Sequence, residues 1–385
     1  MNPPNHDADL LVGDLDESQL LARIFPLLPT NSGVLLGPGD DCAVVSAPDT
    51  RFVVSTDILI ENVHFRQEWS TGYQVGWRAA MQNLADIAAM GARPTSLVVG
   101  LAIPKQLQVN WVTEFARGLG DAARQVGAAV VGGDLSGAEQ IFVSVTVHGD
   151  LEGRAPVLRS GARVGDVVAL AGCTGWSAAG LDVLLRGGLP EDGLDGSLST
   201  ASAQMVALAL QSFLTPTSPI ELGSVAGKAG ATALMDVSDG LIRDAQRICA
   251  ASGVEIVFDY DALLNAVQAP VHNPNLTFTG PPTQEVSTRG ALPKLARLLG
   301  AANADEVDLL VAKWMLTGGE DHALLATFPS ETGVPAGFAT IGRVTASSVP
   351  PSTPTETRRP ATRWGAVRVE GIELDADGVG WDHFR

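Results

Sequence analysis

Hydrophobic and polar positions along the first part of the chain follow both helical and strand spacing, which predicts a mixture of helices and strands. In Ser18–Leu28, the apolar residues lie on one side of a predicted helix. Further helices are predicted over Tyr73–Met90 and Trp111–Val126, the first of them ended by Gly91. Predicted strands are RFVVSTD (51–57), SLVVGLAI (96–103), AAVVGGD (128–134) and IFVSVTVHG (141–149).

The pattern continues after the turn-like segment LEGRAP at 151–156 as a second mixed region. Its predicted helices are Trp176–Leu185, Ala201–Phe213 and Gly240–Ala251. Its predicted strands are DVVALAG (166–172), ATALMD (231–236), VEIVFD (254–259), ALLATF (323–328), TIGRV (340–344) and GAVRVEG (365–371). We therefore expect an α+β fold with two domains, residues 1–150 and 151–385. Segments 187–200, 270–290 and 346–363 are rich in Gly, Pro, Ser and Thr, so we expect mobile surface insertions without chemistry.

Composition supports two folded domains and narrows the class of ligand. The chain has 385 residues, of which 45% are hydrophobic and 18% charged, which is enough to build a core in each half. Its formal net charge is -18, so it lacks the cationic surface that a nucleic-acid-binding protein needs. A polyphosphate ligand would need metal cations between its oxygens and the carboxylates of this acidic chain.

The cysteines and the N-terminus indicate a cytoplasmic protein. Cys42, Cys173 and Cys249 form no CxxC pair, so they are expected to be reduced rather than disulfide-bonded or zinc-bound. The acidic N-terminus has no basic region followed by an apolar stretch, so no signal peptide is expected. No apolar run reaches the length needed to span a membrane.

The common kinase signatures are absent. The sequence contains no GxxxxGK[ST] phosphate loop and no HRD/DFG pair. None of its lysines lies in a Gly-rich context that could surround a phosphate. Phosphoryl transfer by this chain would therefore require a different scaffold.

Short motifs that combine small residues with carboxylates recur along the chain. Their acidic residues are Asp40 and Asp41 in GPGDD, Asp57 in STD, Asp86 in NLADIAAMGA, Asp134 in GGD, Asp236 and Asp239 in MDVSDG, and Glu320 and Asp321 in TGGED. Apart from Asp86, which lies in the predicted helix, we expect these motifs to place a carboxylate where a strand ends, beside small residues that leave backbone N–H groups free for phosphate. Asn83 lies three residues before Asp86 and shares its helical face. Oxygen ligands of this kind suit Mg²⁺.

Taken singly, each motif favours an ordinary turn or helix N-cap. In the same way, His64 and Trp381 alone favour structural roles, and Arg159 alone favours a surface charge. The joint occurrence of these motifs in a chain of modest charge favours a distributed metal site.

The motifs together resemble one known family. GPGDDCAVV, VSTDILIENVHF, NLADIAAMGARP, GGDLSG, RSGARVGD, MDVSDGLIRD, TGGED and GWDHF, in this order, are similar to thiamine-monophosphate kinase of the aminoimidazole ribonucleotide synthetase-like superfamily. The resemblance implies an N-terminal domain whose sheet pairs with that of a second subunit in a homodimer, and a C-terminal α+β domain. It also implies transfer of the γ-phosphoryl group of ATP to thiamine monophosphate, directly and in line, with Mg²⁺ as the metal.

The resemblance assigns roles to residues by motif. It implies Mg²⁺ ligation by Asp41, Ser55, Thr56, Asp57, Asp86, Asp134, Asp236 and Asp239, of which Asp57, Asp134 and Asp236 are taken as catalytic. It implies ATP contacts from Gly133, Asp134, Arg159 and Ser238. It implies thiamine monophosphate contacts from His64, Glu320 and Trp381.

Two positions depart from the family pattern. The segment LTPTSPIELG, around Pro216–Pro219, lacks an arginine found in members of the family, so a phosphate contact from this segment is not expected. His322 follows TGGED where an aromatic residue is common.

Other functions stay open at this point. Aminoimidazole ribonucleotide synthetase is the nearest alternative within the superfamily. Selenophosphate synthetase would need a reactive cysteine before Cys42, and the hydrogenase-maturation relative a C-terminal cysteine in place of DHFR. A non-catalytic nucleotide or metal sensor would be expected to lose some ligands. A calcium-binding scaffold would be expected to carry a DxDxDG loop, which is absent.

Overall fold

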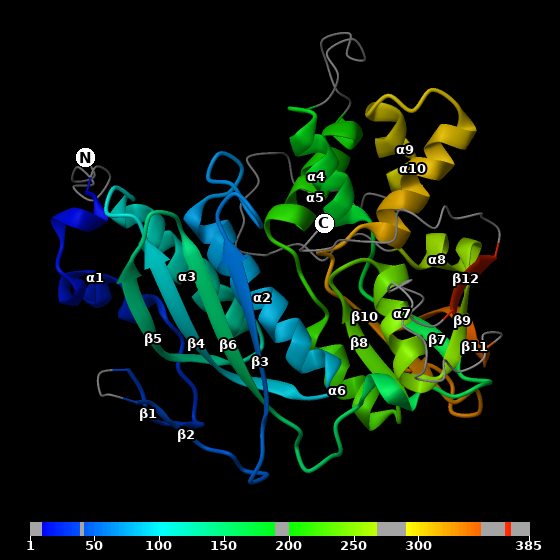
Figure 1. The fold of residues 1–385 in the computed structure, drawn as a ribbon, viewed down its shortest axis with the longest axis horizontal. Coiled ribbons are helices and arrows are strands. Elements are labelled where there is room, and N and C mark those ends of the chain that lie inside the picture. Colours follow the sequence, from blue (N-terminus) through cyan, green and yellow to red (C-terminus); the bar gives the residue numbers. More distant parts are fainter. Residues whose placement is uncertain (1–9, 39–41, 189–199, 268–289, 348–365, 371–385) are drawn as a thin grey trace, which may run out of the picture. The chain divides into compact units, whose positions relative to one another are not determined.

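The computed structural model describes residues 10–38, 42–188, 200–267, 290–347 and 366–370 (Figure 1). The chain divides into two compact units. The N-terminal unit comprises Met1–Ile87, Ala92–Arg154 and Leu214–Pro216, and the C-terminal unit comprises Ala88–Gly91, Ala155–Phe213 and Thr217–Arg385. The principal change from the N-terminal to the C-terminal unit therefore comes after Arg154. The domain boundary expected at residue 150 stays a prediction.

The N-terminal unit is built on a four-stranded sheet with the order β3-β6-β4-β5. β4 and β5 run parallel, and the other two pairs are antiparallel. A separate antiparallel pair is formed by β1 and β2. The strands are β1 (Val34–Leu36), β2 (Val44–Val45), β3 (Val53–Ile60), β4 (Arg93–Ile103), β5 (Ala129–Gly137) and β6 (Phe142–Asp150). The helices are η1 (Val12–Asp14), α1 (Glu17–Ile24), η2 (Phe25–Leu27), α2 (Gly72–Ala89) and α3 (Val109–Gln125).

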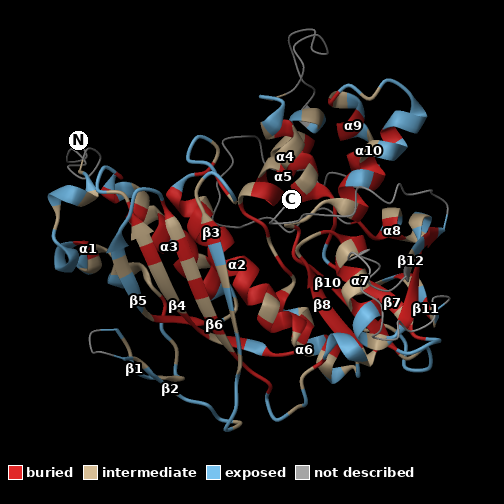
Figure 2. Ribbon diagram, viewed as in Figure 1, coloured by how far each residue is buried: buried red, intermediate tan, exposed pale blue. Residues whose placement is uncertain are grey.

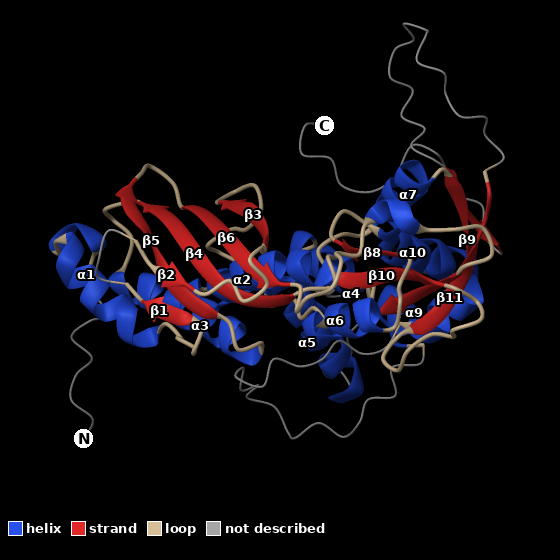
Figure 3. Cartoon of the chain, turned by 90° about the horizontal axis from the view of Figure 1, so that it is seen from below, coloured by secondary structure: helices blue, strands red, loops and turns tan. Residues whose placement is uncertain are grey.

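Helices α2 and α3 cover one face of this sheet (Figures 1 and 3). Figure 2 shows α2 buried along most of its length. Two glycines allow the helices to touch: a Cβ on Gly76 would lie 2.0 Å from the carbonyl oxygen of Phe115, and one on Gly118 1.9 Å from that of Tyr73. The opposite face carries no helix from the described residues of this unit, and we call it the open face.

The C-terminal unit is built on a six-stranded sheet with the order β12-β9-β11-β7-β10-β8, antiparallel except for the pair β12–β9. Its strands are β7 (Val167–Ala171), β8 (Ala233–Val237), β9 (Val254–Asp259), β10 (Ala323–Phe328), β11 (Ala339–Ala346) and β12 (Ala366–Glu370). Its helices are η3 (Arg159–Gly161), α4 (Trp176–Leu185), α5 (Thr200–Leu214), α6 (Ile220–Lys228), α7 (Leu241–Ser252), α8 (Tyr260–Ala266), α9 (Ala291–Leu298) and α10 (Ala304–Thr317).

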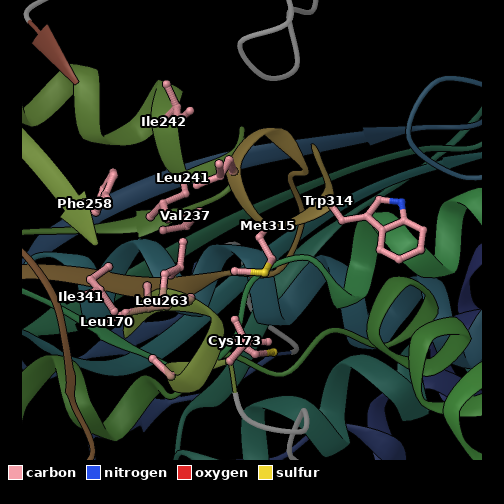
Figure 4. Packing of buried hydrophobic residues seen from close by; sticks show 14 of the residues in the cluster. Leu170, Cys173, Val237, Leu241, Ile242, Phe258, Leu263, Trp314, Met315 and Ile341 are labelled. Atoms are coloured by element: carbon pink, nitrogen blue, oxygen red, sulfur yellow. The ribbon is translucent and has the colours of Figure 1, made fainter. Parts of the chain in front are cut away.

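A single cluster of buried apolar side chains forms the core of the C-terminal unit. Figure 4 shows part of it, where Leu170 of β7 and Val237 of β8 come together with Leu241 of α7 and Met315 of α10. Trp314 donates its ring N–H to Asp182 of α4 at 2.8 Å, which satisfies the one polar atom of a large buried side chain. The core therefore fixes the strand ends and helix starts that carry the motifs.

The predicted α+β class is confirmed, with local differences in individual elements. The helix predicted over Ser18–Leu28 ends at Ile24 and continues as a 3-10 turn, because Pro26 has no N–H to donate and disfavours the α-helix. Helices α6, α8, α9 and α10 were not predicted. Strand β3 continues to Ile60, since the apolar residues after Asp57 extend it.

The segments 187–200, 270–290 and 346–363 lie almost entirely outside the described residues, so their predicted mobility stays a prediction. None of the described helices is both long and apolar enough to cross a membrane.

Candidate functional site

Residues from two predicted motifs meet between β3 and α2 in the N-terminal unit. The hydroxyl of Ser55 donates to Asp86 Oδ2 at 2.6 Å, and the backbone N–H of Asp57 donates to Asn83 Oδ1 at 3.0 Å. Asn83 is held in turn by the carbonyl of Ala79, to which its amide donates at 2.8 Å. The expected shared helical face of Asn83 and Asp86 is therefore present, and it faces the strand that carries Asp57.

Thr56 points the other way. Its hydroxyl donates to the carbonyl of Val145 at 2.8 Å and lies 2.9 Å from the hydroxyl of Thr146 on β6. Successive residues of a strand face opposite sides of the sheet, so the Thr56 hydroxyl lies on the open face, away from Asp57. Its predicted role as a metal ligand stays a prediction.

Asp57 and Asp134 also lie on opposite faces of the sheet. The register aligns Asp57 with Val145 of β6, whereas it aligns Asp134, through Gly100 of β4, with Ser144. Val145 and Ser144 are consecutive and therefore face opposite sides. Asp57 thus faces α2, while Asp134 projects from the open face.

The expectation that both aspartates lie where a strand ends is wrong. Asp57 lies inside β3 and Asp134 inside β5, because the apolar or small residues that follow each aspartate continue the ladder. Gly133 beside Asp134 has no room for a side chain, since a Cβ there would lie 2.0 Å from the carbonyl oxygen of Val99. Asp134 accepts a hydrogen bond from the Ser136 hydroxyl at 3.1 Å.

In the C-terminal unit, the motifs MDVSDG and TGGED form two turns docked backbone to backbone. Glu320 N–H donates to the carbonyl of Ser238 at 2.8 Å, and His322 N–H donates to that of Val237 at 3.0 Å. A Cβ on Gly319 would lie 2.4 Å from the Ser238 oxygen, so only glycine permits this approach. Glu320 and His322 have φ values of 70° and 52°, and such strained backbone is concentrated at functional sites.

His322 lies between carboxylates of both turns. Its Nδ1 is 3.4 Å from Asp236 Oδ2, and its Nε2 is 3.6 Å from Glu320 Oε2. Burial opposes protonation of His322, but its hydrogen bond to Asp236 and the nearby charges of Asp236 and Glu320 raise its pKa to about 10. His322 is therefore an imidazolium at neutral pH, which offsets the charges of one predicted metal ligand and one predicted substrate contact.

Asp321 joins the TGGED turn to the start of α4. Its buried carboxylate accepts backbone N–H groups from Gly175 at 2.6 Å and Ser177 at 2.8 Å. Burial raises its pKa to about 7, although these two hydrogen bonds oppose the shift.

Burial and the charge of Asp321 raise the pKa of the Cys173 thiol well above its ordinary value, so this cysteine is unreactive. All three cysteines are free.

His64 and Arg159 lie in different settings. His64 accepts the backbone N–H of Ile60 on Nδ1 at 3.0 Å, so its neutral form carries the proton on Nε2. Arg159 begins the exposed turn η3, and its carbonyl accepts the Ser252 hydroxyl at 2.8 Å. Asp41 and Trp381 lie outside the described residues, so their predicted roles stay predictions.

Sequence reasoning missed two residues that hold the MDVSDG turn. Asp244 accepts the backbone N–H groups of Ser238 and Asp239 at 3.0 Å each, and Arg247 contacts both Asp239 and Asp244. A helical acid–base pair three residues apart is the only signal in the sequence, and it is common on exposed helices.

A pocket of about 760 Å³ lies in the N-terminal unit. Gly133 and Asp134 line it, but most of its walls are apolar side chains such as Leu21, Phe115 and Val130. Such walls do not suit a triphosphate, so we do not assign the pocket as the ATP site.

Comparisons with known proteins agree with this architecture. Residues 39–151 match the family model described as AIR synthase related protein, N-terminal domain. The thiamine-monophosphate kinase of Mycobacterium tuberculosis is 42% identical over 81% of this chain and 79% of its own length. That of Corynebacterium glutamicum is 35% identical over 87% of each chain. The solved structure of AaThiL complexed with AMPPCP and TMP superposes with a TM-score of 0.65 and 30% identity, covering 90% of this chain and 91% of that one.

The fold and the family model place the chain among the AIR synthase-related proteins. The sequence identity to the thiamine-monophosphate kinases of Mycobacterium tuberculosis and Corynebacterium glutamicum extends over most of both chains. This similarity defines the family within the AIR synthase-related proteins. The chain belongs to the thiamine-monophosphate kinase family.

Proposed function

We propose that this chain transfers the γ-phosphoryl group of ATP to thiamine monophosphate, giving thiamine diphosphate and ADP. Membership of the family supports this activity, as does its similarity to a solved relative complexed with AMPPCP and TMP. The observation on this chain that carries the proposal is the docking of the two motif turns, which brings Asp236 and Glu320 to either side of His322. A predicted metal ligand and a predicted substrate contact thereby occupy one rigid unit.

The transfer uses Mg²⁺, which the carboxylates of this chain are suited to hold. Asp57 and Asp86 beside Ser55, and Asp236 and Asp239 in the other unit, are hard oxygen donors. Among the described residues, no group of three His, Cys, Asp or Glu forms a ready metal cluster. Mg²⁺ keeps water and phosphate oxygens among its ligands. When bound, Mg²⁺ neutralises negative charge on the phosphate oxygens.

The reaction needs no dedicated general base. The nucleophile is an oxygen of the thiamine monophosphate phosphate group, which is already ionised at neutral pH. The bond from the γ-phosphorus to its bridging oxygen breaks, ADP leaves, and a new diphosphate linkage forms. His64, as an Nε2–H donor, suits orientation of the acceptor phosphate rather than removal of a proton. Gly133, Arg159 and Ser238 are proposed to contact ATP, and Glu320 and Trp381 the thiamine monophosphate.

In a homodimer whose two open faces pack together, Asp134 would face the partner subunit and take part in the reaction there. Phe52, Val54 and Ile58 expose 56%, 56% and 42% of their surface on or beside β3, and exposed apolar patches of this kind mark interaction surfaces. Val54 and Ile58 share the open face with Asp134. We therefore infer that Asp134 acts toward the partner subunit, while Asp57 serves its own.

Product analysis tests the proposed activity. The full chain is incubated with MgCl₂ and ATP, together with either thiamine monophosphate or formylglycinamidine ribonucleotide, and products are separated by chromatography. Thiamine diphosphate and ADP in equal amounts are expected from the first mixture only. ATP consumption that depends on the ribonucleotide would instead assign the chain to ring-closing chemistry.

A further inference from the structure

Arg247 and Asp244 of helix α7 close a ring of contacts around the MDVSDG turn. Asp244 is fully buried, and its Oδ2 accepts the backbone N–H groups of Ser238 and Asp239 at 3.0 Å each. Its Oδ1 accepts from Nη1 of Arg247, while Nη2 of the same guanidinium contacts Oδ2 of Asp239. The side chain and the backbone of Asp239 are therefore both held from α7.

The positive charge of Arg247 in this ring offsets part of the negative charge of Asp236, Asp239 and Asp244. Burial raises the pKa of Asp244 to about 7, the nearby charge of Asp236 adds to the shift, and Arg247 opposes it. The side chains of Arg247 and Asp239 are 27% and 18% exposed, so water and salt screen their attraction only in part. The guanidinium thus supplies positive charge at a carboxylate that the proposed function assigns to Mg²⁺.

We propose that Arg247 is a built-in counter-cation of Asp239 that competes with Mg²⁺ for this carboxylate. The inference rests on the proposed function, because it takes Asp239 as a metal ligand. The guanidinium contacts Oδ2 of Asp239, so it takes up part of the charge of this carboxylate and repels a second cation that approaches it. Mg²⁺ therefore binds weakly at Asp239 in the absence of ATP.

A purely structural role for Arg247 predicts the opposite effect of its removal. If the guanidinium only fixed the turn, its loss would loosen Asp239 and weaken Mg²⁺ binding. Under competition, Arg247→Gln removes the competing charge while Asp244 still holds the backbone of the turn, so binding becomes tighter. The sign of the change separates the two roles.

Isothermal titration calorimetry of the full chain with MgCl₂, without nucleotide, measures whether Arg247→Gln binds Mg²⁺ more tightly or more weakly than the wild type. Arg247→Gln is expected to bind Mg²⁺ about 10-fold more tightly than the wild type, as for removal of one partly screened charge. Arg297→Gln, on the exposed surface of α9, changes the net charge equally and is expected to leave the affinity unchanged. Arg247→Lys keeps the charge and is expected to bind as weakly as the wild type.

A double-mutant comparison ties the effect to Asp239. In an Asp239→Asn background, Arg247→Gln is expected to change Mg²⁺ affinity little, because the contested carboxylate is gone. Unchanged or weaker binding by Arg247→Gln, an equal gain in the Asp239→Asn background, or no Mg²⁺ binding to either chain would overturn the inference. These readouts need no turnover. If Mg²⁺ affinity behaves as expected but no thiamine diphosphate forms, the proposed function fails and the competition stands.

Discussion

Nδ1 of His322 lies 3.4 Å from Oδ2 of Asp236, in a buried contact that joins the two motif turns of the C-terminal unit. The other ring nitrogen faces Glu320 at 3.6 Å. One imidazolium therefore links a carboxylate that is proposed to bind the metal with one that is proposed to contact the substrate. The family resemblance alone gave no role to this position, where an aromatic residue is common.

Replacement of His322 by Phe should damage both turns. It leaves the buried Asp236 carboxylate without its cationic partner, which we expect to cost about 3 kcal/mol of unfolding free energy and to lower kcat/KM for thiamine monophosphate at least about 10-fold. Urea unfolding and steady-state kinetics measure the two effects. His322→Gln, which keeps hydrogen-bonding groups, should lie between Phe and the wild type. A Phe variant as stable and active as the wild type would show that the contact has no role.

Asp321 should make the stability of the protein fall as pH rises. Its pKa of about 7 lies above the ordinary carboxyl value of 3.8, so between these values the folded chain keeps a proton that the unfolded chain has lost. The contribution of Asp321 to stability is therefore greatest at acid pH and decreases toward pH 7. Asp321→Asn cannot ionise and loses one acceptor, so it should be less stable by about 1–3 kcal/mol at pH 5.

The difference in unfolding free energy between the wild type and Asp321→Asn should then narrow from pH 5 to pH 8. Urea unfolding at several pH values measures it. A difference that stays constant with pH would mean that Asp321 is ionised throughout, and a difference that widens would also contradict its raised pKa.

Gly319→Ala should separate the two motif turns. The added Cβ would lie 2.4 Å from the carbonyl oxygen of Ser238, and this backbone atom cannot move without breaking the contacts between the turns. We expect a loss of about 2–3 kcal/mol in unfolding free energy and a severe loss of activity. Gly137→Ala is the matched control, because an added methyl group there would meet no atom within 4 Å and its φ is not left-handed. Equal effects of the two substitutions would argue against steric docking of the turns.

Asp57→Asn and Asp134→Asn should complement each other. If Asp134 acts toward the partner subunit, a mixed dimer of these two inactive variants contains one intact site. After subunit exchange at equal concentrations, activity should return to about one quarter of the wild-type value, since half of the dimers are mixed. If both aspartates serve one site in the same chain, every site in the mixture is damaged and activity stays absent.

The fold class and several contacts follow from sequence pattern because they depend on local spacing. Asn83 and Asp86 had to share a helical face, and the structure turns that face toward Asp57. The strand ends were misplaced at Asp57 and Asp134, because glycine and aspartate commonly end strands and here they do not. Local sequence pattern cannot show where a strand ends when pairing with a neighbouring strand extends it past such residues.

The tertiary partners of the motifs could not be predicted in the same way. Arg247 is eight residues from Asp239 along the chain, and only the position of α7 against the turn brings them together. The contact between His322 and Asp236 spans 86 residues of sequence. Opposite faces for Asp57 and Asp134 follow from the register of four strands, which hydrophobic pattern alone does not fix.

The most direct measurement follows the γ-phosphate of ATP. The full chain is incubated with γ-³²P-labelled ATP, MgCl₂ and thiamine monophosphate, and the labelled products are separated, with Asp236→Asn as the inactive control. The label should appear in thiamine diphosphate, only with Mg²⁺ present and not with the variant. Release of the label as inorganic phosphate without labelled thiamine diphosphate, or transfer that persists in EDTA, would contradict the account.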